Sequence, residues 1–89
     1  MPTIIACHEV TDTDLWLASP KRAEVLPEFG ASNIRTFVDP ENPKRVGLVM
    51  NVAALEVFAA AIANPPENLA AAMKHDGVVR ETMSVYVAS

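Results

Sequence analysis

Four stretches of the chain carry the residues expected of β-strands. Thr3 to Val10 is β-branched or small and shows no helical period. In Ser32 to Val38, Arg45 to Val52 and Val78 to Val87, successive side chains fall on opposite faces of an extended chain. Residues 39–44, between the second and third stretches, are dense in turn formers. This spacing predicts that the second and third strands form an antiparallel hairpin.

A helical period follows the first strand, and a proline divides it. The apolar stripe over residues 13–29 consists of Leu15, Trp16, Val25, Leu26 and Phe29. Pro20 interrupts the stripe, because proline lacks an N–H group and its ring clashes with the preceding turn. We therefore expect a kinked or two-piece helix that ends near Pro27 to Gly30.

The second helical stretch is also divided. We expect it to open at Asn51 or Val52 and to stop at Asn64-Pro65-Pro66. Its apolar positions repeat at i, i+3, i+4 and i+7, on Leu55, Phe58, Ala59 and Ile62. A short second piece, Glu67 to His75, carries Leu69, Ala72 and Met73 on one face. Gly77 suits the position just past its end.

The predicted order of elements is β-α-β-β-α-β, which is the ferredoxin-like arrangement of an α+β protein. We expect residues 1–89 to form a single domain, since 89 residues leave room for only one. In this arrangement both helical segments cover the same face of a four-stranded antiparallel sheet.

The other face of that sheet is expected to need a partner. A sheet with one wet face should alternate cleanly between apolar and polar residues. Here Val49 and Phe37 lie opposite the apolar face of their strands, and residues 4–6 are apolar on both faces. Burial of ~400 Å² of such surface contributes on the order of 10 kcal/mol before the cost of association. We therefore expect two sheets to face each other in a homodimer.

Charge and cysteine content narrow the class of protein. A net charge of −4 argues against nucleic acid and anionic membranes as partners. The longest uncharged run, residues 57–66, is too short to span a bilayer. A lone cysteine, Cys7, and a start without the features of a signal peptide predict a soluble cytoplasmic protein. The histidines and acidic residues match no zinc spacing.

With this order of elements, the chain resembles the dimeric α/β-barrel superfamily over nearly its full length. The resemblance rests on Asp14-Leu15-Trp16, Phe29 to Asn33, Arg35 to Pro43, and Ala70 to Val78. That superfamily includes antibiotic-biosynthesis-type monooxygenases and a branch of small uncharacterised proteins. It also includes isomerases, haem-degrading enzymes and proteins with no assigned reaction, so the resemblance implies the fold more than an activity.

The two histidines are the candidate catalytic residues. His75 lies at the predicted C-terminal end of a helix, where it is either a general acid or base at the barrel mouth or a capping cation. His8 lies on the first strand. It is a pocket residue if it faces the barrel interior, or a core histidine if it faces the helices. Cys7 points the opposite way from His8, which argues against a shared metal, and we interpret it as a small buried hydrophobe.

The resemblance also bears on cofactors. In the haem-degrading branch a histidine on the second helix binds iron, but that branch also uses a helical tryptophan and a strand-one asparagine with no equivalent here. We therefore expect no cofactor and no metal.

Four further residues are candidates for ligand binding, each with a structural alternative. Arg35 could bind an anionic group or form an ion pair at the rim. Asn51 and Tyr86 offer neutral hydrogen-bonding groups near the sheet ends, or pack at the dimer seam. Trp16 is either a core residue or a pocket wall.

Two functional readings remain open from the sequence. In the first, the protein is a cofactor-independent oxygenase, cyclase or isomerase that acts on a small apolar or aromatic molecule inside the barrel. In the second, it is a non-catalytic module that binds a small ligand or only dimerises. A pocket of roughly 300 Å³ or more favours ligand binding, whereas a filled interior favours the structural role.

Overall fold

A four-stranded antiparallel sheet forms the base of the computed structural model, which describes residues 2–88. The strands are β1 (Thr3–Val10), β2 (Ala31–Val38), β3 (Arg45–Val52) and β4 (Val78–Val87). Their order in the sheet is β2-β3-β1-β4, and each neighbouring pair is antiparallel. The predicted strands are confirmed, with β2 beginning one residue earlier than expected.

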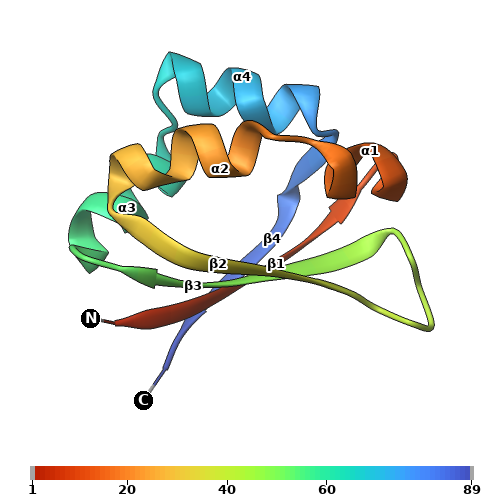
Figure 1. Cartoon of the computed structure of the whole chain (residues 1–89), viewed down its shortest axis with the longest axis horizontal. Coiled ribbons are helices and arrows are strands. Elements are labelled where there is room, and N and C mark those ends of the chain that lie inside the picture. The colour runs from red at the N-terminus through yellow and green to blue at the C-terminus, as the bar shows by residue number, and fades with distance from the viewer. Residues whose placement is uncertain (1, 89) are drawn as a thin grey trace.

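The helices lie over one face of this sheet (Figure 1). They are α1 (Thr13–Ala18), α2 (Lys21–Val25), the 3-10 turn η1 (Leu26–Phe29), α3 (Leu55–Ala63) and α4 (Glu67–His75). The first helical stretch is thus divided at residues 19–20, as the proline predicted, and it ends at Gly30 in a left-handed conformation. The order of elements confirms the ferredoxin-like β-α-β-β-α-β fold.

Three details differ from the sequence prediction. In α3, Ala59 is exposed and Ala61 takes the buried place that was expected for it. Helix α3 begins at Leu55 and not at Asn51 or Val52, because both of those residues continue strand β3 and pair with β2. Leu15 was expected in the core, but it is 41% exposed on the outer side of α1. The six-residue α1 is too short to bury adjacent positions, and its neighbour Trp16 takes the inward place.

The core fills the space between the helices and the sheet. The sheet contributes alternate residues of β1 and β3, which are Ile4, Ala6, His8, Val10, Val46, Leu48, Met50 and Val52. The helical layer contributes Trp16, Leu26, Phe58, Leu69 and Met73, all buried. The predicted face of α4, made by Leu69, Ala72 and Met73, is confirmed.

The opposite face of the sheet is uncovered by any helix of the described chain (Figure 1). Its central strands pair Ile5 with Val49 on one side and with Tyr86 on the other. Ile5 is 37% exposed, Phe37 48% and Tyr86 61%. The expected apolar character of both sheet faces is therefore confirmed. We call this surface the open face.

Gly77 joins α4 to β4 in a backbone conformation that other residues rarely adopt. Its φ is +71°, and its carbonyl accepts a hydrogen bond from the Thr11 amide at 2.9 Å. The turn follows Asp76, which is the C-cap residue of α4 and lies 3.8 Å from Nη1 of Arg22 in α2. Glycine is required here because a Cβ would overlap the Thr11 hydroxyl.

We expect Gly77→Ala to lower the free energy of unfolding by roughly 1–3 kcal/mol, through backbone strain and the clash with Thr11. Urea denaturation at fixed protein concentration measures the change. The matched control is Gly47→Ala in strand β3, where the added Cβ would meet Cys7 Sγ at an ordinary 3.6 Å. Equal losses in the two variants would contradict this account.

Candidate functional site

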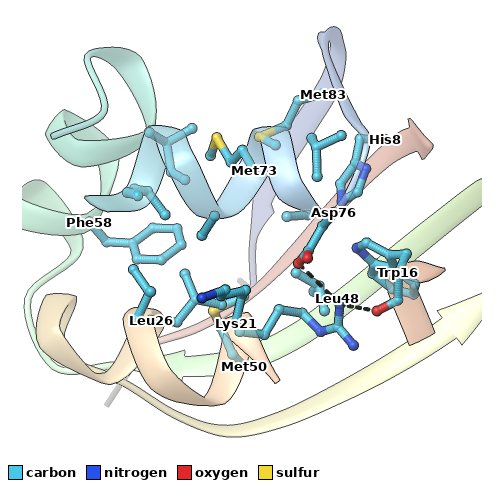
Figure 2. Close-up of a pocket in the computed structure, with 17 residues that line it drawn as sticks. His8, Trp16, Lys21, Leu26, Leu48, Met50, Phe58, Met73, Asp76 and Met83 are labelled. Carbon is cyan, nitrogen blue, oxygen red and sulfur yellow. Dashed lines mark hydrogen bonds and ion pairs between the residues drawn. The ribbon is translucent and has the colours of Figure 1, made fainter. Parts of the chain in front are cut away.

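A small cavity lies between the helices and the sheet, on the side away from the open face. Its volume is about 60 Å³, and most of its wall is apolar. Figure 2 shows Leu26 and Phe58 on one side, Met50 and Leu48 below, and Met73 above. The polar residues of the wall are His8, Lys21, Arg22 and Asp76. The cavity is therefore an apolar space with a few polar groups converging on it, which is the usual composition of a small-molecule site.

His8 is the polar residue contributed by the sheet. It lies on β1, is 1% exposed, and points toward the helices. Its Nδ1 lies 3.1 Å from the backbone oxygen of Glu9. A carbonyl oxygen can only accept, so Nδ1–H donates, and in the neutral ring Nε2 carries the lone pair. The Trp16 ring approaches edge-on, with ring centroids 5.8 Å apart and planes at 79°.

The sheet is irregular beside His8. Strand β1 pairs Cys7 with Ser84 and Glu9 with Val79, so residues 80–83 of β4 lie opposite His8 alone. The Thr82 hydroxyl occupies this irregularity, accepting from the Glu9 amide at 2.9 Å and donating to the Val79 carbonyl at 2.6 Å. The displaced segment includes Met83, which lines the cavity with His8. We call this segment the β4 bulge.

Burial lowers the pKa of His8 below its ordinary value of 6.5. The hydrogen bond to Glu9 acts in the opposite direction, whereas Arg22 and Arg45 lower the pKa further. The imidazole is therefore neutral at pH 7. A neutral imidazole with a free Nε2 lone pair in an apolar wall can accept a proton from a bound molecule.

An ion pair joins α2 to the end of α4 at the edge of the cavity. Nη1 of Arg22 lies 3.8 Å from Oδ2 of Asp76, and their side chains are 13% and 4% exposed. The same Nη1 donates to the Trp16 carbonyl at 2.6 Å, and the guanidinium lies over the Trp16 ring at 4.3 Å. Figure 2 draws the bond and the ion pair as dashed lines. Burial lowers the pKa of Arg22, with Asp76 acting in the opposite direction, but arginine stays charged.

The structure settles the orientation of both histidines. His8 faces the helices, which is the orientation expected of a core histidine and not that of a pocket residue in the barrel interior; on this side of the sheet it lines the small cavity. His75 is 47% exposed at the end of α4, with Nδ1 2.9 Å from Oδ1 of Asp76. It is therefore a surface partner of Asp76, and it is not among the residues that line the cavity.

The predicted ligand-binding residues divide between the two sides of the sheet. Trp16 is buried and also forms part of the cavity wall, so it is a core residue that lines a pocket. Arg35 and Tyr86 are exposed, and they lie on the open face with Asn51. The amide oxygen of Asn51 accepts from the Thr3 hydroxyl at 2.8 Å. Whether these three meet a ligand between two sheets stays a prediction. Cys7, also on the open face, is half-buried.

Sequence reasoning missed Arg22 and Asp76. The two residues are far apart in the chain, and their helices show no shared motif. Asp76 stands between His75 and Gly77, a position typical of an exposed helix end. Only the packing of α2 against α4 buries it. The signal that could have marked the site is a charged residue, Arg22, in the first turns after Pro20 on an otherwise apolar inward face.

Among residues 2–88, no group of three or more histidine, cysteine or acidic side chains is placed to hold a metal ion. Over the same residues, no helix is long and apolar enough to cross a bilayer.

Solved structures share this architecture, although no protein-family model and no curated protein sequence matches the chain. A Bordetella bronchiseptica protein provisionally named an antibiotic biosynthesis monooxygenase matches with a TM-score of 0.70 at 17% identity, over 99% of this chain and 94% of its own. A similarly named Nitrosomonas europaea protein gives 0.64 at 14% identity, over 100% and 97%. One from Chloroflexus aurantiacus gives 0.61 at 15% identity, over 99% and 92%.

These matches confirm the resemblance stated from the sequence. The chain has the fold of the proteins named as antibiotic biosynthesis monooxygenases, and that fold extends over its whole described length. At such low identity the likeness establishes the fold and leaves the reaction to be argued from the site.

The lowered pKa of His8 predicts a stability that falls with acidification. Above pH 6.5 the histidine is neutral in both the folded and the unfolded chain, so it adds no pH dependence. Below pH 6.5 the unfolded chain binds a proton that the folded chain refuses until its own lower pKa is reached. The free energy of unfolding should then fall by up to about 1.4 kcal/mol per pH unit.

Urea denaturation at pH 7.5 and 5.5 measures this change. His8→Gln should show a flatter pH dependence than the wild type, since the remaining titrating groups are common to both. Parallel curves for the two proteins over this interval would contradict the assignment of a depressed His8 pKa.

Proposed function

We propose that this protein is a cofactor-independent enzyme of the oxygenase or isomerase type, and that its reaction begins when His8 removes a proton from a small apolar molecule. The observation that carries the proposal is a neutral, nearly inaccessible imidazole in the wall of an apolar cavity. The shared fold with proteins named as monooxygenases supports the same class of chemistry.

Two polar groups of the cavity, His8 and Arg22, have roles in such a reaction. Nε2 of His8 accepts the proton, while the Nδ1 hydrogen bond to Glu9 fixes the ring and its tautomer. The negative charge left on the substrate faces the guanidinium of Arg22, which stabilises it in a site of low polarity. An isomerisation returns the proton to a neighbouring atom. An oxygenation adds O₂ to the carbanion to give a peroxide anion, which takes back the proton from His8. The hydroperoxide then loses water, together with a second hydrogen of the same carbon, to leave a carbonyl.

The size of the cavity sets a condition on the substrate. An apolar cavity of roughly 150 Å³ can hold benzene, and this one has a volume of only about 60 Å³. An aromatic substrate therefore enters only if the wall moves. Helix α2 is the part of the wall best suited to move, because it has five residues, no side-chain N-cap, and a proline immediately before it.

The same small volume favours a second function. It lies well below the roughly 300 Å³ typical of ligand pockets, as expected of a non-catalytic module with a largely filled interior. In that case His8 is a satisfied core residue, and the open face is the functional surface.

Both functions include a homodimer formed through the open face. Ile5, Phe37 and Tyr86 expose apolar surface there, and a second copy would cover the same residues by symmetry. The resemblance to the dimeric α/β-barrel superfamily implies the same pairing of sheets. Arg35, Asn51 and Tyr86 would then line the seam between the two sheets.

The enzymatic proposal predicts that proton abstraction depends on His8. Enolisable 1,3-dicarbonyl and hydroxyaromatic compounds are incubated with the protein in D₂O, with hydrogen exchange followed by NMR and O₂ uptake followed in parallel. We expect His8→Gln to reduce exchange by about 10²–10⁴-fold. His75→Gln separates the two histidines. If exchange is lost with His75→Gln and kept with His8→Gln, or if no compound exchanges with the wild type, the proposed role of His8 is wrong.

The dimer predicts that a charge on the open face releases monomers. We expect Phe37→Asp to shift the sedimenting species at low micromolar concentration from twice the 9.6 kDa chain mass toward the mass of one chain. Val57→Asp, which alters an equally exposed apolar residue on α3, serves as the control. A wild-type protein that sediments as a stable single chain would overturn the dimer.

A further inference from the structure

Arg22 is a buried cation whose hydrogen-bonding capacity is largely unused. A guanidinium has five N–H donors. One of them reaches the Trp16 carbonyl at 2.6 Å. The ion pair to Asp76, at 3.8 Å, is longer than a hydrogen bond. The side chain is 13% exposed, and no fully buried polar atom of the described side chains lacks a partner, so the remaining N–H groups are open to water or to an incoming acceptor. A carboxylate that displaced this water would gain charge-assisted hydrogen bonds.

Asp76 does not compete strongly for those donors. Its other carboxylate oxygen, Oδ1, accepts from Nδ1 of His75 at 2.9 Å, and its backbone amide is bonded within α4. The carboxylate is thus held from the α4 side, while Arg22 approaches it from α2 without closing to hydrogen-bond distance. Arg22 is instead fixed by stacking on Trp16, with Cζ 4.3 Å from the ring centroid.

The charges around the cavity balance, so the charge of a ligand depends on which polar group is open to it. Arg22 faces Asp76, His8 is neutral, and Glu24 pairs with Lys21 at 3.9 Å on the exposed side of α2. Arg22 donates only one hydrogen bond within the protein, and a single carboxylate can accept two of its remaining N–H groups side by side. A dianion would place its second charge beside the Asp76 carboxylate, and a cation would face Arg22.

The apolar wall and the volume of the cavity determine the size and polarity of the rest of the ligand. The enclosed 60 Å³ corresponds to the share of about two water molecules in the liquid, which is room for a tail of a few carbon atoms. That tail would lie among Leu26, Phe58 and Met73, which Figure 2 shows around the cavity.

We propose that Arg22 binds the acidic oxygen of a small monocarboxylic acid whose short apolar tail fills the cavity beneath α2. Arg22 is then a specificity-determining residue, and the ligand class is a carboxylate rather than a neutral molecule. The inference deepens the proposed function, since it uses the same cavity. In that reaction the carboxylate would anchor the molecule at Arg22, so that its tail lies in the cavity whose wall also includes the imidazole of His8.

Trp16 allows a direct test, because it is the protein's only tryptophan and contacts Arg22. Its fluorescence is titrated with straight-chain carboxylates from propanoate to octanoate and with the primary amides of the same chain lengths. Each pair has the same shape and differs in charge. We expect the wild type to bind the best carboxylate at least 10-fold more tightly than its amide, and to lose this preference at high salt.

Three variants then test the role of Arg22 in this preference. Arg22→Gln should bring the ratio of carboxylate affinity to amide affinity close to one. Arg22→Lys keeps the charge but lacks the paired N–H donors of the guanidinium, and it should retain a smaller preference for the carboxylate. Arg80→Gln removes an exposed arginine of β4 that lies outside this cavity, and it should keep the wild-type ratio. The wild-type comparison of acid with amide needs no variant, so it holds even if Arg22→Gln unfolds.

The outcomes separate this proposal from the enzymatic one. Equal binding of acids and amides by the wild type would overturn the role of Arg22 and leave an apolar cavity available to His8. A preference for carboxylates that survives in Arg22→Gln would overturn it as well. If neither series of compounds changes the Trp16 fluorescence of the folded wild type, both the proposed ligand class and the proposed small-molecule function of the cavity are wrong.

Discussion

The four-stranded sheet of this short chain has apolar residues on both of its faces, and the helices cover only one of them. This constraint shapes the rest of the molecule. On the covered face, β1 and β3 contribute alternate apolar residues to a core closed by Trp16, Leu26 and Phe58. On the open face, Ile5, Phe37 and Tyr86 stay exposed. The surfaces proposed for function are therefore of two kinds, an enclosed one beneath the helices and an exposed one across the sheet.

The enclosed surface owes its cavity to the way in which the helical layer is divided. Pro20 separates α1 from α2, and residues 64–66 separate α3 from α4, so the sheet is covered by short pieces and not by two long rods. Short pieces meet at ends, and ends expose backbone and charged side chains. The ends of α1 and α4 bring the Trp16 carbonyl and Asp76 to the same place, where Arg22 of α2 joins them. Polar groups therefore lie within the apolar helical layer at the ends of its helices.

Much of this fold could be predicted from local patterns, because strand alternation and proline breaks are properties of neighbouring residues. The bounds of β1, β3, α4 and β4 followed from them. The start of α3 did not, since ladder hydrogen bonds to β2 hold Asn51 and Val52 in the sheet and no local signal reports those bonds. The site was predicted only in part. His8 and Trp16 were found by residue type, but Arg22 and Asp76 become a pair only when α2 packs on α4, which depends on the whole topology.

The β4 bulge has a consequence for how this fold can vary. Because four residues of β4 stand opposite His8 alone, the pairing before the bulge and the pairing after it are set independently. In a regularly paired stretch of the sheet, a one-residue insertion would turn every following side chain to the wrong face. Within residues 80–83 the added length would be taken up locally. The wall beside the imidazole can therefore be reshaped by changes in chain length while the remaining ladder, and the surface on its far side, keep their register.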